Sequence, residues 1–378
     1  MALRRHAAAL RPAELPLSRE IPRGFLRYME PDDYEAYARR FRAAFAGAIA
    51  STGPEVARAE AVAALGRLAA GGAGVAPRPL LHDAAGDFSR RFLVGALLDD
   101  DVERLAGWVE DVAFATAIGT PTARASAALA AFGETLARRA AGRPDAGGES
   151  VTGHLLREDP RALDDETVRG NLFLLYTASR DSIGSLLAWA LYRLSDAPDW
   201  VERLRATPRS DAPASAAEPR PGTGDPFTWT ILETLRLGQS EYVYRRVLEP
   251  IEVEGFRVPR GWILRVCVAE SHLLDPPFAE PERFDPGRFE RGRFGPEAYA
   301  PFGLDRHACL GARMSMLLGR TFAEELVHGF DWTVVETGPP ERGNRHWNHW
   351  APSGRFRVAL VPRGVSADAR APAGSSSR

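Results

Sequence analysis

Lysine is missing from this chain, and cysteine nearly so. All 48 basic residues are arginine, they stand against 50 acidic residues, and the formal net charge is −2. Such an even balance gives no reason to expect nucleic acid or an anionic membrane as a partner. The two cysteines, Cys267 and Cys309, are too few for a disulfide framework or a four-ligand zinc site, which favours a reducing compartment.

Signals for export and for membrane insertion are also missing. The first twenty residues lack an apolar core adequate for export. The longest apolar run, 168–194, could cross a bilayer by length, but it carries Arg180 and Asp181 at its centre. Unpaired charges at that depth are costly in lipid. We therefore expect a cytoplasmic, soluble protein without membrane attachment.

What the chain does have is helical periodicity over most of its length. With 378 residues and 45% hydrophobic side chains it can bury a substantial core. Apolar residues recur at spacings of three and four from about 32 to 141. The stretch "LDDETVRGNLFLLYTASRDSIGSLLAWALYRL" then predicts about 27 residues of continuous helix, apolar all round and therefore central. Another helix is expected over 227–238.

Strand patterns are confined to the C-terminal half. Residues 251–268 alternate with a period of two and predict a hairpin that turns at 259–261. Further strands are expected at 331–336 and 354–363, after a Pro- and Arg-rich meander at 275–303. The fold class predicted is mainly α with a small β subdomain. The predicted division is an extended segment at 1–31, a single domain at 32–363 with a mobile excursion at 205–226, and a disordered tail at 364–378.

The cysteine-bearing loop "FGLDRHACLG", 302–311, carries the strongest chemical signal. An apolar helix follows it, so Cys309 lies at the first turn, where unpaired amides and the positive dipole end favour the thiolate. A thiolate is a nucleophile or a metal ligand. Gly303 and Gly311 would let a flat cofactor approach the backbone, with Phe302 packed beneath it. The plain alternative is a buried, inert thiol.

Two other motifs indicate a function only in combination with the cysteine loop. Glu233 and Arg236 in "ETLR" lie three apart on one helix face, where the default interpretation is a surface ion pair. Asp181 and Ser182 in "ASRDSIG" interrupt the apolar central helix. A buried carboxylate is costly without a partner, so a functional role competes there with a capped kink or an ion pair to a neighbouring helix.

Together and in this order, these motifs resemble the cytochrome P-450 family of haem-thiolate monooxygenases, over about 34 to 363. The resemblance implies a cytochrome P-450-like fold with the long central helix over haem b, and "FDPGRF" supplies Arg288 beside Glu233 and Arg236 as a structural triad. Cys309 would be the thiolate ligand of the haem iron. The cofactor-binding residues that the resemblance implies are Cys309, His307, Arg245, Phe302, Gly303, Gly311, Ala178 and Arg39.

The resemblance also implies roles in catalysis and substrate binding. Asp181 would be the acid and Ser182 the hydroxyl of a proton relay that serves oxygen activation, which thiolate ligation favours. Trp347 and Trp350 would stack on a flat or aromatic substrate. The residues implied for the substrate pocket are Leu174, Thr177, Glu241, Val243 and Trp347.

Some positions depart from the family pattern. Asp305 stands where the cysteine loop usually has a second glycine, and Ser182 replaces the usual threonine; Ser179 and Ile183 are further changes in the same helix. Tyr34 occupies the usual histidine or tryptophan position of the helix at the haem edge. Ala38 occupies the usual arginine position there, so the neighbouring Arg39 is expected to substitute for it.

The chain also looks N-terminally short for a soluble, bacterial-type member of the family. We therefore expect the haem pocket to be open on one side, or covered by a second copy in a homodimer, a protein partner, a carrier-borne substrate or rearranged N-terminal residues. No flavin or iron–sulfur motif is present, so electrons are expected from a ferredoxin or flavodoxin-type redox partner.

The function implied is hydroxylation or oxidative coupling of a small organic, aromatic or carrier- or peptide-borne intermediate of secondary metabolism. Three alternatives stay open. One is a haem-thiolate enzyme that catalyses a rearrangement or bond formation without inserting oxygen, and another is an inactive haem-binding protein. The third is a cysteine hydrolase, for which His307, two residues before Cys309 in a loop, is poorly placed as the base.

Overall fold

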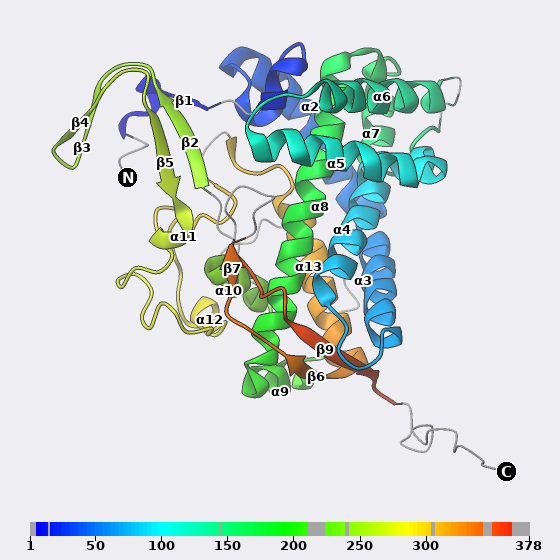
Figure 1. The fold of residues 1–378 in the computed structure, drawn as a ribbon, viewed down its shortest axis with the longest axis vertical. Coiled ribbons are helices and arrows are strands. Elements are labelled where there is room, and N and C mark those ends of the chain that lie inside the picture. Colours follow the sequence, from blue (N-terminus) through cyan, green and yellow to red (C-terminus); the bar gives the residue numbers. More distant parts are fainter. Residues whose placement is uncertain are drawn as a thin grey trace.

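The computed structural model describes residues 5–13, 16–141, 143, 145–209, 224–238, 242–303, 307–342 and 350–364. Helices make up most of this structure, and small sheets lie to one side and at one end of them (Figure 1). The predicted fold class, mainly α with a small β part, is confirmed. None of the helices in these ranges is long and apolar enough to cross a membrane. Most of the predicted excursion at 205–226 and nearly all of the predicted tail at 364–378 lie outside the described residues.

The helices within 31–141 lie where apolar spacing predicted helix, as do two of those after the central helix. Those before the central helix are α2 (Pro31–Ser51), α3 (Gly53–Ala70), α4 (Pro77–Val94), α5 (Val102–Ile118), α6 (Ala123–Ala140) and α7 (Val151–Glu158). Those after it are α9 (Pro198–Ala206), α10 (Pro226–Gly238), α11 (Val268–Ser271), α12 (Arg288–Arg291) and α13 (Ala312–Gly329). Here α10 and α13 lie where helix was predicted, whereas α7, α9, α11 and α12 were not predicted. Short 3-10 helices are η1 (Ala7–Ala9), η2 (Pro16–Glu20), η3 (Leu26–Tyr28), η4 (Gly95–Asp101) and η5 (Ala162–Asp164).

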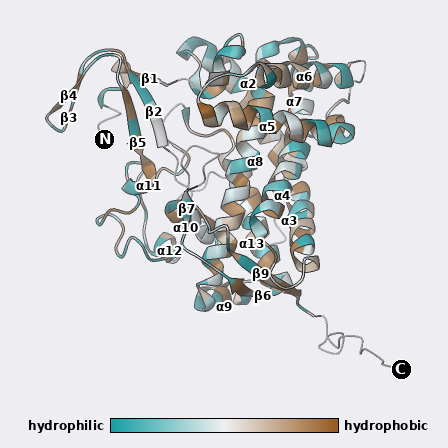
Figure 2. Cartoon of the chain, viewed as in Figure 1, coloured by the Kyte–Doolittle hydropathy of each residue, from teal (hydrophilic) through white to brown (hydrophobic). Residues whose placement is uncertain are grey.

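The central helix is α8 (Glu166–Ser195), which runs through the middle of the molecule (Figure 1). It is 30 residues long, slightly more than the sequence predicted. The Asp165 carboxylate caps its first turn by accepting a hydrogen bond from the Thr167 amide at 2.7 Å. The helix packs against α4, α6, α10 and α13, so its faces meet different neighbours, and its hydrophobic residues (Figure 2) are covered by them.

Within the described ranges, the strands form four small antiparallel sheets. β1 (Leu10–Pro12), β2 (Tyr242–Val247) and β5 (Ile263–Cys267) form one sheet in the order β1-β2-β5. The three pairs are β3 (Ile251–Val253) with β4 (Phe256–Val258), β6 (Phe330–Glu336) with β9 (Arg357–Pro362), and β7 (Glu341–Arg342) with β8 (Trp350–Ala351). The segment predicted as extended, 1–31, thus contributes β1 and three short 3-10 helices.

The prediction of a hairpin turn at 259–261 is wrong, because the strands on its two sides do not pair with each other. The chain turns instead at Glu254 (φ 48°) and Gly255 (φ 81°), which joins β3 to β4. Two successive residues with positive φ produce a turn whose twist matches that of the strands it connects. Residues 259–261 lead from β4 to β5, and β5 pairs with β2.

A buried ionic network fixes α10 against the meander that precedes the cysteine loop. Glu233 accepts hydrogen bonds from Arg236 Nε at 2.8 Å and from Arg288 Nε at 3.0 Å, and all three side chains are at most 7% exposed. The Asp285 amide also donates to Glu233, and Arg236 Nη1 donates to the His272 carbonyl. Every charge in the network has partners, as burial of charge requires.

We expect Glu233→Gln to lower the free energy of unfolding by about 3–5 kcal/mol, because both arginines would lose a buried countercharge. Urea unfolding of the full chain measures this change. Glu202→Gln is the matched control, since Glu202 pairs with Arg205 three positions along α9 but is 70% exposed. Its effect should stay below about 1 kcal/mol. Equal effects of the two substitutions would contradict the account of the network.

Candidate functional site

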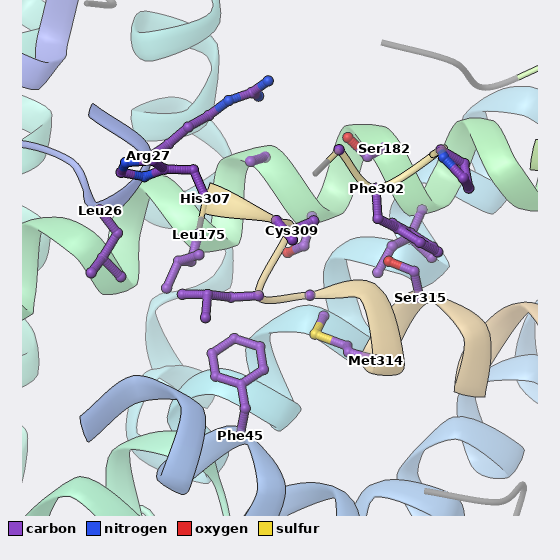
Figure 3. A pocket seen from close by; sticks show the side chains of 18 of the residues that line it. Leu26, Arg27, Phe45, Leu175, Ser182, Phe302, His307, Cys309, Met314 and Ser315 are labelled. Carbon is purple, nitrogen blue, oxygen red and sulfur yellow. The ribbon is translucent and has the colours of Figure 1, made fainter. Parts of the chain in front are cut away.

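A cavity of about 230 Å³ lies where α8, the cysteine loop, the start of α13 and the segment around η3 meet (Figure 3). Its walls are mostly apolar, with few polar groups. Figure 3 shows Cys309 near the middle of the labelled side chains, Arg27 and His307 toward one end, and Phe302 and Ser315 toward the other. A mostly apolar cavity with a few convergent polar groups is the usual form of a cofactor or ligand site.

One face of α8 lines this cavity. The residues involved are Leu175, Ala178, Ser179, Ser182, Ile183 and Leu186. Their spacings alternate between three and one, which places them on a single stripe of the helix. The predicted site residues Ala178 and Ser182 therefore lie on the cavity side.

Three other predicted residues of α8 lie on neighbouring faces. Leu174, Thr177 and Asp181 are each one position away from a residue of the stripe, which turns them by about 100°. None of them lines the cavity. Leu174 is buried, Thr177 donates its hydroxyl to the Leu174 carbonyl at 3.0 Å, and Asp181 lies 3.6 Å from His82 Nδ1 on α4.

The cysteine loop is held by its own backbone. The Cys309 amide donates to the Phe302 carbonyl at 2.8 Å, and the Cys309 carbonyl accepts from the Ala312 amide at 3.3 Å as α13 begins. Gly303 has φ 77°, a conformation that a side chain would strain. Phe302, Gly303, His307, Cys309 and Gly311, which the resemblance implied for cofactor binding, all line the cavity. Asp305 lies outside the described residues.

Among the described residues, three basic side chains line the cavity: Arg27, Arg245 and His307. Arg245 comes from β2 and His307 from the cysteine loop, as predicted. Arg27 comes from η3, and sequence reasoning missed it. The segment that carries Arg27 is tied to α8 by Asn171, which accepts from the Leu26 amide at 2.7 Å and donates to the Gly24 carbonyl at 3.1 Å.

Arg39 does not take the place predicted for it. It is exposed on α2, whereas its neighbours Tyr34 and Ala38 face the core. A position next to Ala38 on a helix points about 100° away from it, so Arg39 cannot substitute for a side chain there. Tyr34 instead packs on His307, with ring centroids 4.3 Å apart, and its hydroxyl accepts from Arg42 Nη2 at 2.8 Å.

The remaining residues predicted to contact substrate are Glu241, Val243, Trp347 and Trp350. Glu241 and Trp347 lie outside the described residues, and Val243 is placed only as part of β2. Trp350 is 44% exposed, and its carbonyl accepts from Trp189 Nε1 at 3.0 Å. It therefore ties β8 to α8.

A buried histidine supports the cavity wall next to the loop. His272 Nε2 accepts a hydrogen bond from the Ala300 amide at 3.0 Å, and Ala300 lines the cavity just before Phe302. Burial, with a smaller contribution from the nearby Arg236 charge, lowers the pKa of His272 to about 4. The imidazole is therefore neutral at pH 7, as an acceptor must be.

The family model for cytochrome P450 matches residues 151–356, just over half of the chain. This chain belongs to the cytochrome P450 family. Abscisic acid 8'-hydroxylase 3 of Oryza sativa subsp. indica is 30% identical over 214 residues, which cover 52% of this chain and 41% of that protein. The putative cytochrome P450 135B1 of Mycobacterium tuberculosis strain H37Rv is 31% identical over 182 residues, or 48% of this chain and 37% of that protein.

The matched part therefore spans only about two fifths of the length of these curated relatives. A solved structure, described as retinoic acid bound cyanobacterial CYP120A1, superposes with a TM-score of 0.76 and covers 96% of this chain and 88% of its own. Its sequence identity of 19% makes it a statement about fold alone. The P450 fold expected from the sequence is thus confirmed, and haem b is the cofactor of the family.

The residues of the cavity fit a haem group. A cysteine, small residues at 178, 303 and 311 and mostly apolar walls suit a flat macrocycle, and three basic side chains suit its two propionates. We expect Arg27→Gln to raise the rate of haem transfer to apomyoglobin several-fold, because one basic partner is lost. Arg39→Gln is the matched control and should leave this rate unchanged. A faster transfer from Arg39→Gln than from Arg27→Gln would contradict the placement of both residues.

The His272 pKa predicts a pH dependence of stability. Between about pH 6.5 and pH 4 the unfolded chain binds a proton that the folded protein excludes, so stability is lost as the pH falls through this window. The loss reaches at most roughly 3 kcal/mol by pH 4. His272→Gln keeps an acceptor for Ala300 and cannot titrate, so its urea midpoint should fall less between pH 7 and pH 4.5 than that of the wild type. Identical slopes would show that His272 does not titrate across this window.

Proposed function

We propose that this chain is a haem-thiolate monooxygenase in which Cys309 would hold the haem iron as a thiolate. The observation that carries the proposal is the joint placement of Cys309 and the α8 stripe at Ala178 and Ser182 in one cavity. Haem bound through a thiolate supplies oxygen activation. Cys309 lies three residues before α13 begins at Ala312, not in its first turn as the sequence predicted, and the positive end of that helix dipole favours the thiolate that such ligation requires.

The protein's own contribution is to hold the cofactor, to shape the cavity and to supply protons. Arg27, Arg245 and His307 would bind the propionates, with Tyr34 packed against the His307 ring. Ser182 is the hydroxyl on the cavity face that can pass a proton inward. Asp181, the acid next to it, lies on the outer side of that face and must act through a water molecule or a rotation of its side chain.

The substrate class we propose is a small, largely apolar organic molecule, because the cavity walls are mostly apolar. The relatives named for abscisic acid and the fold relative bound to retinoic acid agree with such a class. Electrons would come from a ferredoxin or flavodoxin-type protein. A role in secondary metabolism, a cytoplasmic location and a homodimer or partner over the N-terminal side stay predictions.

The spectrum of the reduced, carbon monoxide-bound protein tests thiolate ligation directly. Wild type should show the Soret band shift diagnostic of a thiolate ligand, and Cys309→Ala should abolish it. Cys267→Ala is the matched control, because Cys267 ends β5 and does not line the cavity. Loss of the shift in Cys267→Ala but not in Cys309→Ala would overturn the assignment.

Oxygen labelling separates the monooxygenase from an enzyme that catalyses a rearrangement or bond formation. A panel of small apolar acids and aromatic compounds is screened for a substrate-induced spin-state change, and the compound that gives it is turned over under labelled oxygen. Label in the product supports the proposal. A product without label, formed without matching oxygen consumption, would favour the non-oxygenating alternative.

A further inference from the structure

Two polar pairs, His82 with Asp181 and Asp83 with Arg180, lie side by side where α4 crosses the middle of α8. His82 Nδ1 lies 3.6 Å from Asp181 Oδ1. Arg180 donates through Nη1 to the same Asp181 oxygen at 3.2 Å and through Nη2 to Asp83 Oδ1 at 3.4 Å. Neighbouring residues of one helix therefore pair with neighbouring residues of the other, and Asp181 is held from two directions.

Glycines at the crossing make room for this cluster. A Cβ atom added to Gly184 would lie 2.7 Å from His82 Cα and Cγ, so only glycine lets the His82 ring lie against α8. A Cβ atom on Gly86 of α4 would meet the Arg180 side chain at 3.4 Å, which is ordinary van der Waals contact, so Gly184 is the glycine on which the crossing depends. The close approach of His82 to Asp181 is thus set by the residue at 184.

Burial is graded across the cluster. The side chain of Asp83 is 62% exposed, that of Asp181 19% and that of His82 13%. His82 Nε2 is buried and has no hydrogen-bond partner among the described residues. Buried polar atoms nearly always have one, so an internal water molecule is expected at Nε2. The Asp181 carboxylate, 3.6 Å from Nδ1, favours the tautomer with hydrogen on Nδ1.

The cluster adjoins the cavity through the next residue of α8. Ser182 lines the cavity, and Asp181 lies between it and His82 along the surface of the helix. We propose that His82 and Asp181 form a proton-exchange pair that carries protons from the outer side of α8 to the cavity face at Ser182. The pair rests on the proposed function, because it gives the oxygen chemistry its protons.

The transfer balances within these groups. Nε2 of His82 accepts a proton from a hydronium ion of the solvent, and Nδ1–H gives its proton to Asp181 Oδ1 once side-chain motion has closed the 3.6 Å gap, which leaves the ring as the Nε2–H tautomer. Asp181 then carries the proton toward Ser182 through a water molecule or a side-chain rotation. Once Asp181 has passed its proton on, the first tautomer is restored when Nδ1 takes a proton from solvent and Nε2 returns one to it, with no net change in protons.

The other titratable and charged groups around the pair do not provide this exchange. On α4 they are Asp83, Asp87 and Arg90, and on α8 they are Tyr176 and Arg180. Burial raises the pKa of Tyr176 to about 12, so it keeps its proton at neutral pH. Guanidinium groups stay charged at any working pH, whereas imidazole is the side chain suited to exchange protons near neutrality. We therefore treat His82 as a positioning and proton-exchange residue, not as a group that touches substrate.

The first test reads the pair without any turnover. Nitrogen NMR of histidine-labelled, haem-loaded protein, in its diamagnetic carbon monoxide form, should show the His82 ring as the Nδ1–H tautomer. Asp181→Ala should remove that preference, because the acceptor at Nδ1 is lost. A ring that is the Nε2–H tautomer in wild type, or that does not respond to Asp181→Ala, overturns the pair.

The second test uses reoxidation of the dithionite-reduced, haem-loaded protein in air-saturated buffer, which needs no substrate. Without the pair, protons would reach the cavity only through water molecules that diffuse into it. His82→Gln should therefore slow reoxidation about tenfold and flatten the pH dependence of its rate near neutrality. It should also alter the rate ratio between H2O and D2O.

His154→Gln is the matched control. His154 on α7 lies 3.5 Å from Glu149 and packs on Gly47, where an added Cβ atom would be 2.5 Å from its ring, but it is not part of the cavity. Equal rates, pH profiles and isotope ratios for the two variants would overturn the exchange role. If the protein lacks the thiolate spectrum but His82→Gln still slows reoxidation, the assignment of Cys309 is overturned and the proton-exchange pair is retained.

Discussion

The rotation of about 100° per residue along α8 governs what each side chain of this helix can reach. Ser182 meets the cavity, and Asp181, one position earlier, meets His82 on α4. The helix is continuous for 30 residues and enclosed by several neighbours, so these directions cannot be exchanged without moving the core. An acid and a hydroxyl that are adjacent in sequence are therefore assigned to two sides of one helix. Asp181 therefore faces the partly exposed cluster that contains His82, and Ser182 faces the cavity.

The cysteine loop depends on supports that lie outside it. Arg236 joins the Glu233 network to the His272 carbonyl, and His272 in turn holds the Ala300 amide at the cavity wall. The buried ion pairs of the Glu233 network and the neutral His272 therefore both help to fix the position of the residues that precede Cys309. The opposite wall depends on Asn171, which fixes the segment that carries Arg27. The cavity is formed by packing of elements that are far apart in the chain.

Much of this arrangement could be predicted from the sequence. Apolar spacing predicted the buried helices, and the motif around Cys309 predicted the residues of the loop that line the cavity. Arg27 could not be predicted, because a single turn of 3-10 helix has no periodic pattern that shows which way it points. Asn171 was the available signal, since an amide in an apolar helix must find partners. Arg39 was misplaced because adjacency in sequence was taken for adjacency in space, and the turn at Glu254 was missed because non-glycine residues seldom adopt positive φ.

The central claim is that one cavity holds haem between Cys309 and the Ala178–Ser182 face of α8. A crystal structure of the haem-loaded protein tests it most directly. The account predicts electron density joining Cys309 Sγ to the iron, Ala178 and Ser182 on the other face of the macrocycle, and Arg27 within hydrogen-bond reach of a propionate. Iron bound by a different side chain, or haem seated outside this cavity, would contradict it.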